Sequence, residues 1–492
     1  MEIFNQPANR FIKRILVVAS VIISGLCWYF STGLNGGFWY LLWLAPIPVL
    51  IISFNAKAKT TFFISFLAYL IGRLSWFSYL VTVATIIPAI IFTITLPLIF
   101  ALIILITRRT VLTINTWYSI FAFPVFFTTF EFLLITFSPD GTAGSIAYSQ
   151  LNFLPVVQIA SITGVLGITF MVTFFPSVVA VGWHLRKQRN KLMPLIWVSL
   201  ILLITVFTFG ITRISRNTEA PAVTVGLAVL EEKTHQMGNN INFQNELQHI
   251  KNYAVEINKL AARGAKLVVL PERAINIDRT IDSSAIGILS EAAKQNHIFI
   301  VTGYTNLKNK TERNAALVIN EEGNVVLDYN KVHLVTGLES QFTPGNKIGL
   351  FKFDDVQCGT AICKDLDFPG YIKNYGKSNS IFVCVPAWDF VVDDWLHSRM
   401  AVLRGVENGF SEIRTARLGR LTISDNTGKV TSESNCSNGK ATSLIGKVRL
   451  ENTNTFYRRF GDWFGIMNAA AAILLLFILF IKRSKKEQHS LK

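Results

Sequence analysis

Three polar residues that each stand directly after a short strand-like run have the side chains needed for nucleophilic chemistry. Cys363 follows "GTAI", Glu272 follows "KLVVLP" and Lys331 follows "VVLDYN". Strand ends in layered α/β folds converge on one crevice, so we expect these side chains to meet there. A carboxylate can accept the thiol proton, and an ammonium can lower the thiol pKa and stabilise an oxyanion. The pattern indicates acyl transfer from an ester or an amide through a thioester.

Each of these residues also has an ordinary structural interpretation. Free cysteines are often buried in strand cores, a glutamate after a proline commonly lies in a solvated turn, and a lysine after a strand is commonly on the surface. His333 lies two residues after Lys331 and points to the same face of a strand. It is a candidate for a Cys–His pair or for a packed structural histidine.

The composition excludes an ordinary soluble protein. Of the 492 residues, 51% are hydrophobic and only 16% are charged. The 47 basic against 31 acidic residues give a net charge of +16, but many basic residues flank apolar runs, as membrane orientation requires. The five cysteines show no CxxC or Cys/His spacing, so neither a zinc site nor a disulfide framework is expected. No glycine-rich phosphate loop occurs, and we expect no cofactor.

Apolar segments long enough to cross a hydrocarbon core occupy the first part of the chain and its end. The pattern predicts a polytopic α-helical membrane protein with about eight transmembrane helices. The predicted spans are 11–31, 37–54, 60–80, 83–106, 112–136, 157–183, 192–212 and 465–481.

Basic residues alternate between the loops that join these spans. They lie before the first span, after the second, fourth and sixth spans, and after the last, whereas "STGLNGG" and "FSPDGTAGS" carry none. The basic residues are Arg10, Lys13, Arg14, Lys57, Lys59, Arg108, Arg109, Arg186, Lys187, Arg189, Lys191, Lys482, Arg483, Lys485 and Lys486. By the positive-inside rule, both termini are cytoplasmic and the polar region 213–464 lies outside the cytoplasm.

The domain organisation follows from these spans. We expect a membrane domain with seven helices in 1–212, an extracytoplasmic catalytic domain in 213–464, and an eighth helix with a basic cytoplasmic tail in 465–492. Region 213–464 interleaves β-rich runs with helical spacing and contains a hairpin-like pair around "NEEGN", which predicts an α/β domain with a mixed sheet or sandwich.

Glu131 and Arg73 are charged residues that lie inside predicted spans rather than at a cytoplasmic end. A charge within lipid costs about 2.5–3.5 kcal/mol, so each is a candidate for function. For Arg73, snorkelling to the membrane surface is the alternative to a contact with a lipid headgroup.

The segments around the three candidate residues resemble the nitrilase superfamily. "LPER", "YNKVHLV" and "GTAICKDLDFPG" occur in the order and approximate spacing of its Glu-Lys-Cys triad, which implies an inserted αββα sandwich domain. The resemblance implies that Glu272 is the general base, Lys331 the oxyanion-stabilising cation and Cys363 the nucleophile. "RMAVLRGVENGF" is similar to a downstream family segment, which implies a structural pairing of Arg404 with Glu407.

The membrane segments narrow the resemblance to the apolipoprotein N-acyltransferase family. "YSQLNFLPVVQIASITGVLGITF" (148–170) and "TFYRRFGDWFG" (455–465) are similar to family segments, and "FEFLL" and "GRLSW" are weaker matches. The resemblance implies a monomeric, multi-pass enzyme of the bacterial inner membrane with a periplasmic catalytic domain. It implies transfer of an acyl chain from a phospholipid, through a cysteine thioester, to the N-terminal amino group of a diacylglyceryl-cysteine lipoprotein.

The sequence departs from this family at several positions. Cys363-Lys364-Asp365 stands where the family has Cys-Tyr-Glu, and "TGLES" (336–340) and "PAWDF" (386–390) replace other family motifs. Glu339 still falls where a second active-site glutamate is expected, and Asp365 keeps a carboxylate, so both are secondary active-site candidates. These departures leave open a divergent paralogue that acylates another amine, or a membrane-anchored amide hydrolase with the same triad. A transporter with a degenerate nitrilase-like domain is the least favoured alternative.

Overall fold

The computed structural model describes residues 7–31, 34–216, 219–236, 241–279, 281–307 and 312–490. Within these residues, seven helical segments are long and apolar enough to cross a membrane. They are Phe11–Ser31, Ala58–Ala84, Ile86–Ile114, Trp117–Phe137, Val165–Leu185, Arg189–Ile214 and Trp463–Lys482. Each coincides with a predicted span, which confirms a polytopic helical membrane protein.

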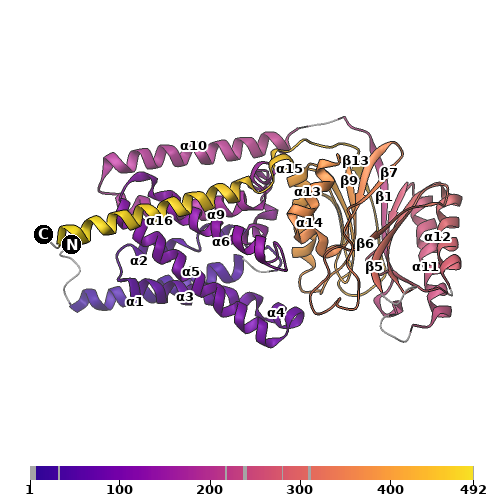
Figure 1. Ribbon diagram of the computed structural model, residues 1–492, viewed down its shortest axis with the longest axis horizontal. Helices are drawn as coiled ribbons and strands as arrows, with labels where there is room; N and C mark the ends of the chain where they lie inside the picture. The colour runs from indigo at the N-terminus through magenta and orange to yellow at the C-terminus, as the bar shows by residue number, and fades with distance from the viewer. Residues whose placement is uncertain are drawn as a thin grey trace.

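The helices of this membrane part are arranged as a bundle of long elements joined by short ones (Figure 1). Their bounds are α1 (Pro7–Ser31), η2 (Trp39–Trp43), α2 (Ile47–Ser53), α3 (Ala58–Arg73), η3 (Leu74–Trp76), α4 (Phe77–Ala84), α5 (Ile86–Ile114), η4 (Trp117–Phe121), α6 (Ala122–Phe137), η5 (Ile146–Asn152), α7 (Leu154–Val157), α8 (Ala160–Thr163), α9 (Val165–Leu185), α10 (Arg189–Ile214), α15 (Phe456–Phe460) and α16 (Trp463–Ser490).

The predicted span 37–54 differs from the others because it is interrupted. It consists of the short elements η2 and α2, and Pro46 and Pro48 at their junction cannot donate backbone hydrogen bonds. Trp43 Nε1 donates to Gln150 Oε1 at 2.8 Å, and at the end of α2 the guanidinium of Arg108 donates to the carbonyl oxygen of Ser53 at 2.9 Å. A break in a helix is tolerated at membrane depth where protein buries it, and α2 packs against α9.

The span predicted at 157–183 begins later than its hydropathy indicates. Two single-turn helices, α7 and α8, come first, and α9 starts after Gly164, whose φ is +68°. A Cβ atom at Gly164 would lie 2.4 Å from the ring of Tyr457, so only glycine fits this turn.

The polar region folds as two packed sheets covered by helices. One sheet has the order β13-β1-β2-β4-β5-β6, with β3 also paired to β4, and the other has the order β12-β11-β10-β9-β8-β7. The strands are β1 (Ala222–Val229), β2 (Leu267–Val269), β3 (Ile275–Ile277), β4 (Phe299–Asn306), β5 (Arg313–Ile319), β6 (Val325–Asn330), β7 (Gly349–Phe353), β8 (Val356–Thr360), β9 (Phe382–Trp388), β10 (Ser411–Arg417), β11 (Arg420–Ser424), β12 (Val430–Asn435) and β13 (Thr442–Arg449).

Helices cover the outer face of each sheet, which gives the αββα sandwich implied by the resemblance. Helices α11 (Phe243–Ala262) and α12 (Asp282–Asn296) pack on the first sheet, and α13 (Pro369–Lys377) and α14 (Asp394–Asn408) pack on the second. The predicted hairpin around "NEEGN" is the antiparallel pair β5–β6. Apolar side chains from both sheets form the core between them.

The layer formed by α13 and α14 lies between the sheets and the membrane part (Figure 1). Helix α14 contacts α8 and η5, and α13 contacts α15. The start of α1 and the end of α16 lie at the opposite end of the membrane part (Figure 1). The side chains of Arg10, Arg483, Lys485 and Lys486, which entered the topology prediction, lie outside the described part of the chain.

Candidate active site

A buried ion-pair cluster joins two of the predicted catalytic residues. Lys331 Nζ lies 2.7 Å from Glu272 Oε1 and 2.9 Å from Glu339 Oε2. The amide nitrogen of Asn314 donates to both carboxylates, at 2.6 Å in each case. The side chains of Lys331 and Glu272 are 1% and 3% exposed, so the cluster is shielded from bulk water. The cluster thus gives one cation two carboxylate partners held by a neutral amide.

The strand ends position this cluster. Glu272 follows β2, and its backbone N–H donates to Ala387 O in β9 of the other sheet at 3.3 Å. Lys331 directly follows β6, and its N–H donates to Asn314 O at 2.9 Å. Gly303 in β4 allows the close approach, since a Cβ there would lie 2.6 Å from the Cα of Glu272. Two strands of the first sheet therefore bring Glu272 and Lys331 together, and the backbone of Glu272 also contacts the second sheet.

Cys363 begins the 3-10 helix η7 (Cys363–Asp367), which follows β8. Its φ is +42°, an unusual value for a residue with a Cβ, and such strain is concentrated at functional turns. The thiol Sγ donates to Trp388 O at 3.6 Å, and the residue keeps part of its surface exposed. All five cysteines are free. Cys363 therefore carries a largely buried thiol on a sharp strand-to-helix turn.

The charged groups of the cluster shift one another's pKa values. Burial raises the pKa of Glu272, and the Lys331 ammonium opposes this rise without cancelling it. Burial also raises the pKa of Glu339, but Lys331 and the Val335 N–H outweigh it and the pKa of Glu339 is lowered. Burial lowers the pKa of Lys331, yet its two carboxylate partners raise it overall. Lys331 is therefore a permanent cation, and Glu272 is the more basic of the two carboxylates.

The same charges act on the thiol. Burial raises the pKa of Cys363 well above that of a free cysteine, Glu272 raises it further, and Lys331 and Arg414 lower it. The resting thiol is therefore neutral and needs a base to become a nucleophile. Two carboxylates, Glu272 and Asp389, act on the thiol through their charge. The pKa of Glu272 is raised and that of Asp389 is lowered, so Glu272 is the stronger base of the two.

Asp365 lies two residues after Cys363 and organises the backbone rather than the cluster. Its Oδ1 accepts from the N–H of Val332 at 3.2 Å and of His333 at 2.8 Å, and its Oδ2 accepts from Ile362 N–H at 3.0 Å and from the Tyr329 hydroxyl at 2.6 Å. These bonds tie the turn that carries Cys363 to the segment after Lys331.

Other predicted residues have structural contacts. His333 Nδ1 lies 3.0 Å from Asp365 Oδ1, and its ring stacks on Phe368 with centroids 3.8 Å apart, which favours the packed histidine over a Cys–His pair. Arg404 and Glu407 form a buried ion pair at 2.8 Å, and this confirms the predicted structural pairing.

The charged residues Glu131 and Arg73 are both buried. Glu131 accepts hydrogen bonds from Ser145, Ile146 N–H and Thr169. Arg73 lies with its guanidinium 5.1 Å from the ring of Trp76. Glu131 therefore anchors the segment after α6, and Arg73 packs on an aromatic ring.

Three polar residues of the site were not identified from the sequence. Asn314 bridges the two carboxylates, and Arg414 binds Asp389 through two hydrogen bonds, from Nη1 to Oδ2 at 2.9 Å and from Nη2 to Oδ1 at 2.5 Å. The charges of Arg414 and Asp389 both reach the Cys363 thiol. Asn314 and Asp389 each lie at one end of an otherwise apolar strand, which is a signal in the sequence, whereas Arg414 lies in the middle of the polar strand β10 and has no such signal.

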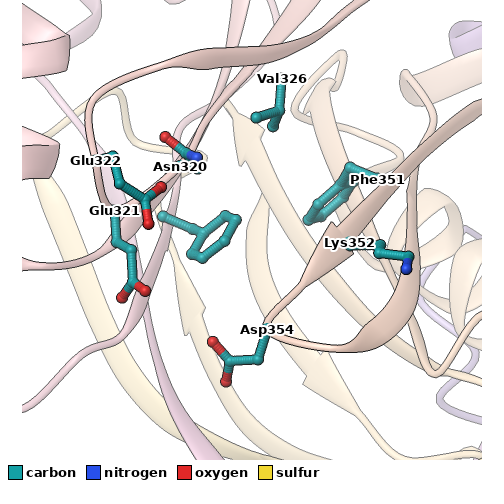
Figure 2. Close-up of a pocket in the computed structure, with 8 residues that line it drawn as sticks. Asn320, Glu321, Glu322, Val326, Phe351, Lys352 and Asp354 are labelled. Carbon is teal, nitrogen blue, oxygen red and sulfur yellow. The ribbon is translucent and has the colours of Figure 1, made fainter.

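A hollow of about 310 Å³ lies away from these residues (Figure 2). It is lined by Phe299, at the start of β4, and by the turns that join β5 to β6 and β7 to β8. Lys331 and Cys363 follow the other ends of β6 and β8, so the hollow is at the opposite end of the sandwich. It contains none of the candidate catalytic residues.

Two protein families match different parts of the chain. Residues 24–178 match the apolipoprotein N-acyltransferase N-terminal domain, and residues 234–451 match the carbon-nitrogen hydrolase family. The first match covers helices of the membrane part, and the second covers most of the sandwich.

Two individual relatives match most of the chain, and a third matches a smaller part of it. The chain is 24% identical over 406 residues to an apolipoprotein N-acyltransferase of Geobacter metallireducens, covering 75% of each chain. It is 25% identical to apolipoprotein N-acyltransferase 1 of Treponema denticola, covering 97% of this chain and 99% of that one. A nitrilase homolog 2 of Dictyostelium discoideum is 30% identical over 163 residues, 29% of this chain and 50% of that one. The chain is therefore a multi-pass bacterial membrane protein that joins an apolipoprotein N-acyltransferase N-terminal domain to a carbon-nitrogen hydrolase domain, and it is similar along nearly its whole length to apolipoprotein N-acyltransferases.

Proposed function

We propose that this protein is an N-acyltransferase that moves an acyl chain from a phospholipid, through a thioester on Cys363, to the N-terminal amino group of a diacylglyceryl-cysteine lipoprotein. The observation that carries the proposal is the buried Glu272–Lys331 pair, whose charges act on the Cys363 thiol in a domain packed against membrane helices. The whole-length relatives named apolipoprotein N-acyltransferase support the substrate class.

The first half-reaction forms the thioester. Glu272 accepts the thiol proton, and the Cys363 sulfur attacks the ester carbonyl carbon of the phospholipid. The Lys331 ammonium stabilises the negative charge that develops on the carbonyl oxygen. As the intermediate collapses, the carbon–oxygen bond breaks and Glu272 returns the proton to the departing alkoxide, which releases a lysophospholipid.

The second half-reaction forms the amide. The acceptor amine attacks the thioester carbonyl carbon, and Lys331 again stabilises the oxyanion. Glu272 takes a proton from the attacking nitrogen and gives it to the departing Cys363 sulfur, which restores the thiol. Water must be kept from the thioester, and the burial of Glu272 and Lys331 favours this. Glu339 and Asp365 act as positioning residues, the first on Lys331 and the second on the turn of Cys363.

For the topology, we propose a monomer in the bacterial inner membrane with cytoplasmic termini and a periplasmic catalytic domain. The divisions are a membrane domain in 1–212, a catalytic domain in 213–464 and a last helix with its tail in 465–492. Arg108 and Lys482 support this orientation, because they bind the carbonyl oxygens of Ser53, the last residue of α2, and Thr113, near the end of α5, and basic residues gather at cytoplasmic helix ends. Tag accessibility in intact spheroplasts tests it, and a cytoplasmic sandwich would refute it.

Reconstitution with a labelled phospholipid tests the chemistry. We expect an acyl adduct on Cys363 by mass spectrometry, no adduct in Cys363→Ser, and loss of the adduct when a diacylglyceryl-cysteine peptide is added. Glu272→Gln and Lys331→Met should each slow adduct formation by about 10²–10⁴-fold, the usual size of an acid–base contribution. Full activity in either variant would contradict its role.

An amide hydrolase is the second candidate, because residues 234–451 match the carbon-nitrogen hydrolase family and a nitrilase homolog 2 is among the relatives. Turnover of small amides without any lipid adduct on wild-type protein would favour it. Restoration of growth in a strain that lacks its own N-acyltransferase would favour the transferase. The two assays therefore separate the two functions.

A further inference from the structure

Lys364, the residue that follows the candidate nucleophile, forms an ion pair with the membrane part. Its Nζ lies 2.6 Å from Oδ1 of Asp140, which stands in the connection between α6 and η5. The Lys364 side chain is 8% exposed and that of Asp140 is 47% exposed, so the pair lies at the edge of the contact between the two parts. An ammonium group is thus placed beside the nucleophile with its charge directed at another domain.

A second contact joins the same connection to the same turn. The N–H and the hydroxyl of Thr142 both donate to Asp367 O, the last carbonyl of η7, at 2.9 Å each. Gly141 has a φ of +53°, and a Cβ there would lie 2.3 Å from the same oxygen. The connection therefore approaches both Lys364 and the end of η7, and only glycine permits the approach.

The far end of this connection is anchored inside the membrane part. Ser145 Oγ donates to Glu131 Oε2 at 3.0 Å, and Ile146 N–H donates to Glu131 Oε1 at 2.9 Å. Glu131 lies in α6 and is buried. An unbroken series of contacts therefore runs from a membrane helix through residues 138–146 to the turn that carries the thiol.

We propose that the Lys364–Asp140 ion pair is a positioning device that holds the Cys363 turn in register with the membrane part, so that the thiol meets the ester of a phospholipid held in the bilayer. The inference rests on the proposed function. Small misplacements of a reacting group are costly, and a donor that cannot leave the bilayer cannot adjust to a displaced thiol. Glu272 and Lys331 are the groups that act on the thiol itself, so Lys364 acts through geometry.

Two reactions of the Cys363 thiol distinguish an effect on its position relative to the bilayer from an effect on its intrinsic reactivity. In proteoliposomes, we expect Lys364→Gln and Asp140→Asn each to slow acylation of Cys363 by phospholipid by about 10²-fold, as expected for a displaced reacting group. Alkylation of Cys363 by water-soluble iodoacetamide should keep its rate, because it needs no register with the bilayer. The double variant should be no slower than the slower single variant, and Lys364→Arg should retain most of the rate.

The matched control is Lys259→Gln, which removes an exposed lysine paired with Glu256 on α11 and should leave both reactions unchanged. Wild-type-like acylation in either pair variant would overturn the inference, as would an equal loss in both reactions. Hydrogen–deuterium exchange of residues 138–149 tests the contact without catalysis. Faster exchange in Lys364→Gln supports the inference, and unchanged exchange overturns it. If wild-type protein forms no acyl adduct, the proposed function fails while the exchange experiment still decides the inference.

Discussion

The guanidinium Nη2 of Arg404 in α14 donates to the hydroxyl oxygen of Tyr148 in η5 at 2.8 Å. The partner of Arg404, Glu407, accepts the N–H of Val165 at the start of α9 at 2.8 Å. Each member of this buried ion pair therefore bonds the membrane part as well as its neighbour in α14. The pair is a joint between the sandwich and the helices.

Breaking this joint should destabilise the whole protein. We expect Arg404→Gln to lower the free energy of unfolding by about 3–5 kcal/mol, because it leaves the Glu407 carboxylate buried without its cation. Tyr148→Phe removes one hydrogen bond and should cost about 1 kcal/mol. Thermal unfolding in detergent measures both. Arg313→Gln is the control, since its pair with Asp328 is partly exposed and worth about 0–1 kcal/mol.

The backbone at Cys363 gives a second prediction. With a φ of +42°, a residue that carries a Cβ is strained there and glycine is not. We expect Cys363→Gly to be more stable than Cys363→Ala by about 1 kcal/mol, although neither has a thiol. At Cys384, inside β9, the order should reverse by about 0.5–1 kcal/mol, because glycine weakens a strand. A Cys363→Gly variant that unfolds at the lower temperature would contradict the strained turn.

The pH dependence of thioester formation should report Glu272. The base acts only when ionised, and burial raises its pKa, so the rate should fall with decreasing pH at values above the range of an ordinary glutamate. The Asn314 amide lowers this pKa by its hydrogen bond to the carboxylate. Asn314→Leu should therefore move the acidic limb of the profile to higher pH. The surface variant Asn252→Leu should leave the profile in place, and an unshifted limb in Asn314→Leu would argue against Glu272 as the base.

Glu412 in β10 should make the stability depend on pH. It is fully buried, both carboxylate oxygens lack a hydrogen-bond partner, and burial raises its pKa to about 8. Because the folded pKa exceeds the unfolded one, the folded state holds this proton more tightly, and the resulting stability is lost as pH rises through about 8. Glu412→Gln should flatten the fall in unfolding temperature between pH 5 and pH 8. An unchanged slope would show that other groups cause it.

The sequence placed the candidate residues at strand ends, and the Glu272–Lys331 ion pair shows that two of them meet. Glu272, Lys331 and Cys363 each follow an apolar run, and such runs predict where side chains converge. Asn314 precedes an apolar run as well, but its role depends on which strand lies beside β6, and pairing between strands is not visible in local patterns. The Arg414–Asp389 pair depends in the same way on the parallel pairing of β9 with β10.

Hydropathy likewise predicted the membrane part but not its irregular elements. An average over 37–54 does not register that Pro46 and Pro48 interrupt the backbone. Nor does it distinguish α7 and α8 from α9, since all of them are apolar and only Gly164 marks the boundary. The strained φ of Cys363 was equally hidden, because a cysteine gives no local signal for the left-handed region.

The interrupted segment Trp39–Ser53 constrains how the nascent chain is inserted. It is shorter than a membrane-crossing helix and packs against α9, which the ribosome makes much later. Exposure of a broken backbone to lipid tails is costly, so we expect the segment to stay in contact with water until α9 emerges. Chains arrested before α9 should leave it accessible to aqueous labels, and completed chains should not. The burial of Trp39–Ser53 therefore depends on a helix that is translated after it.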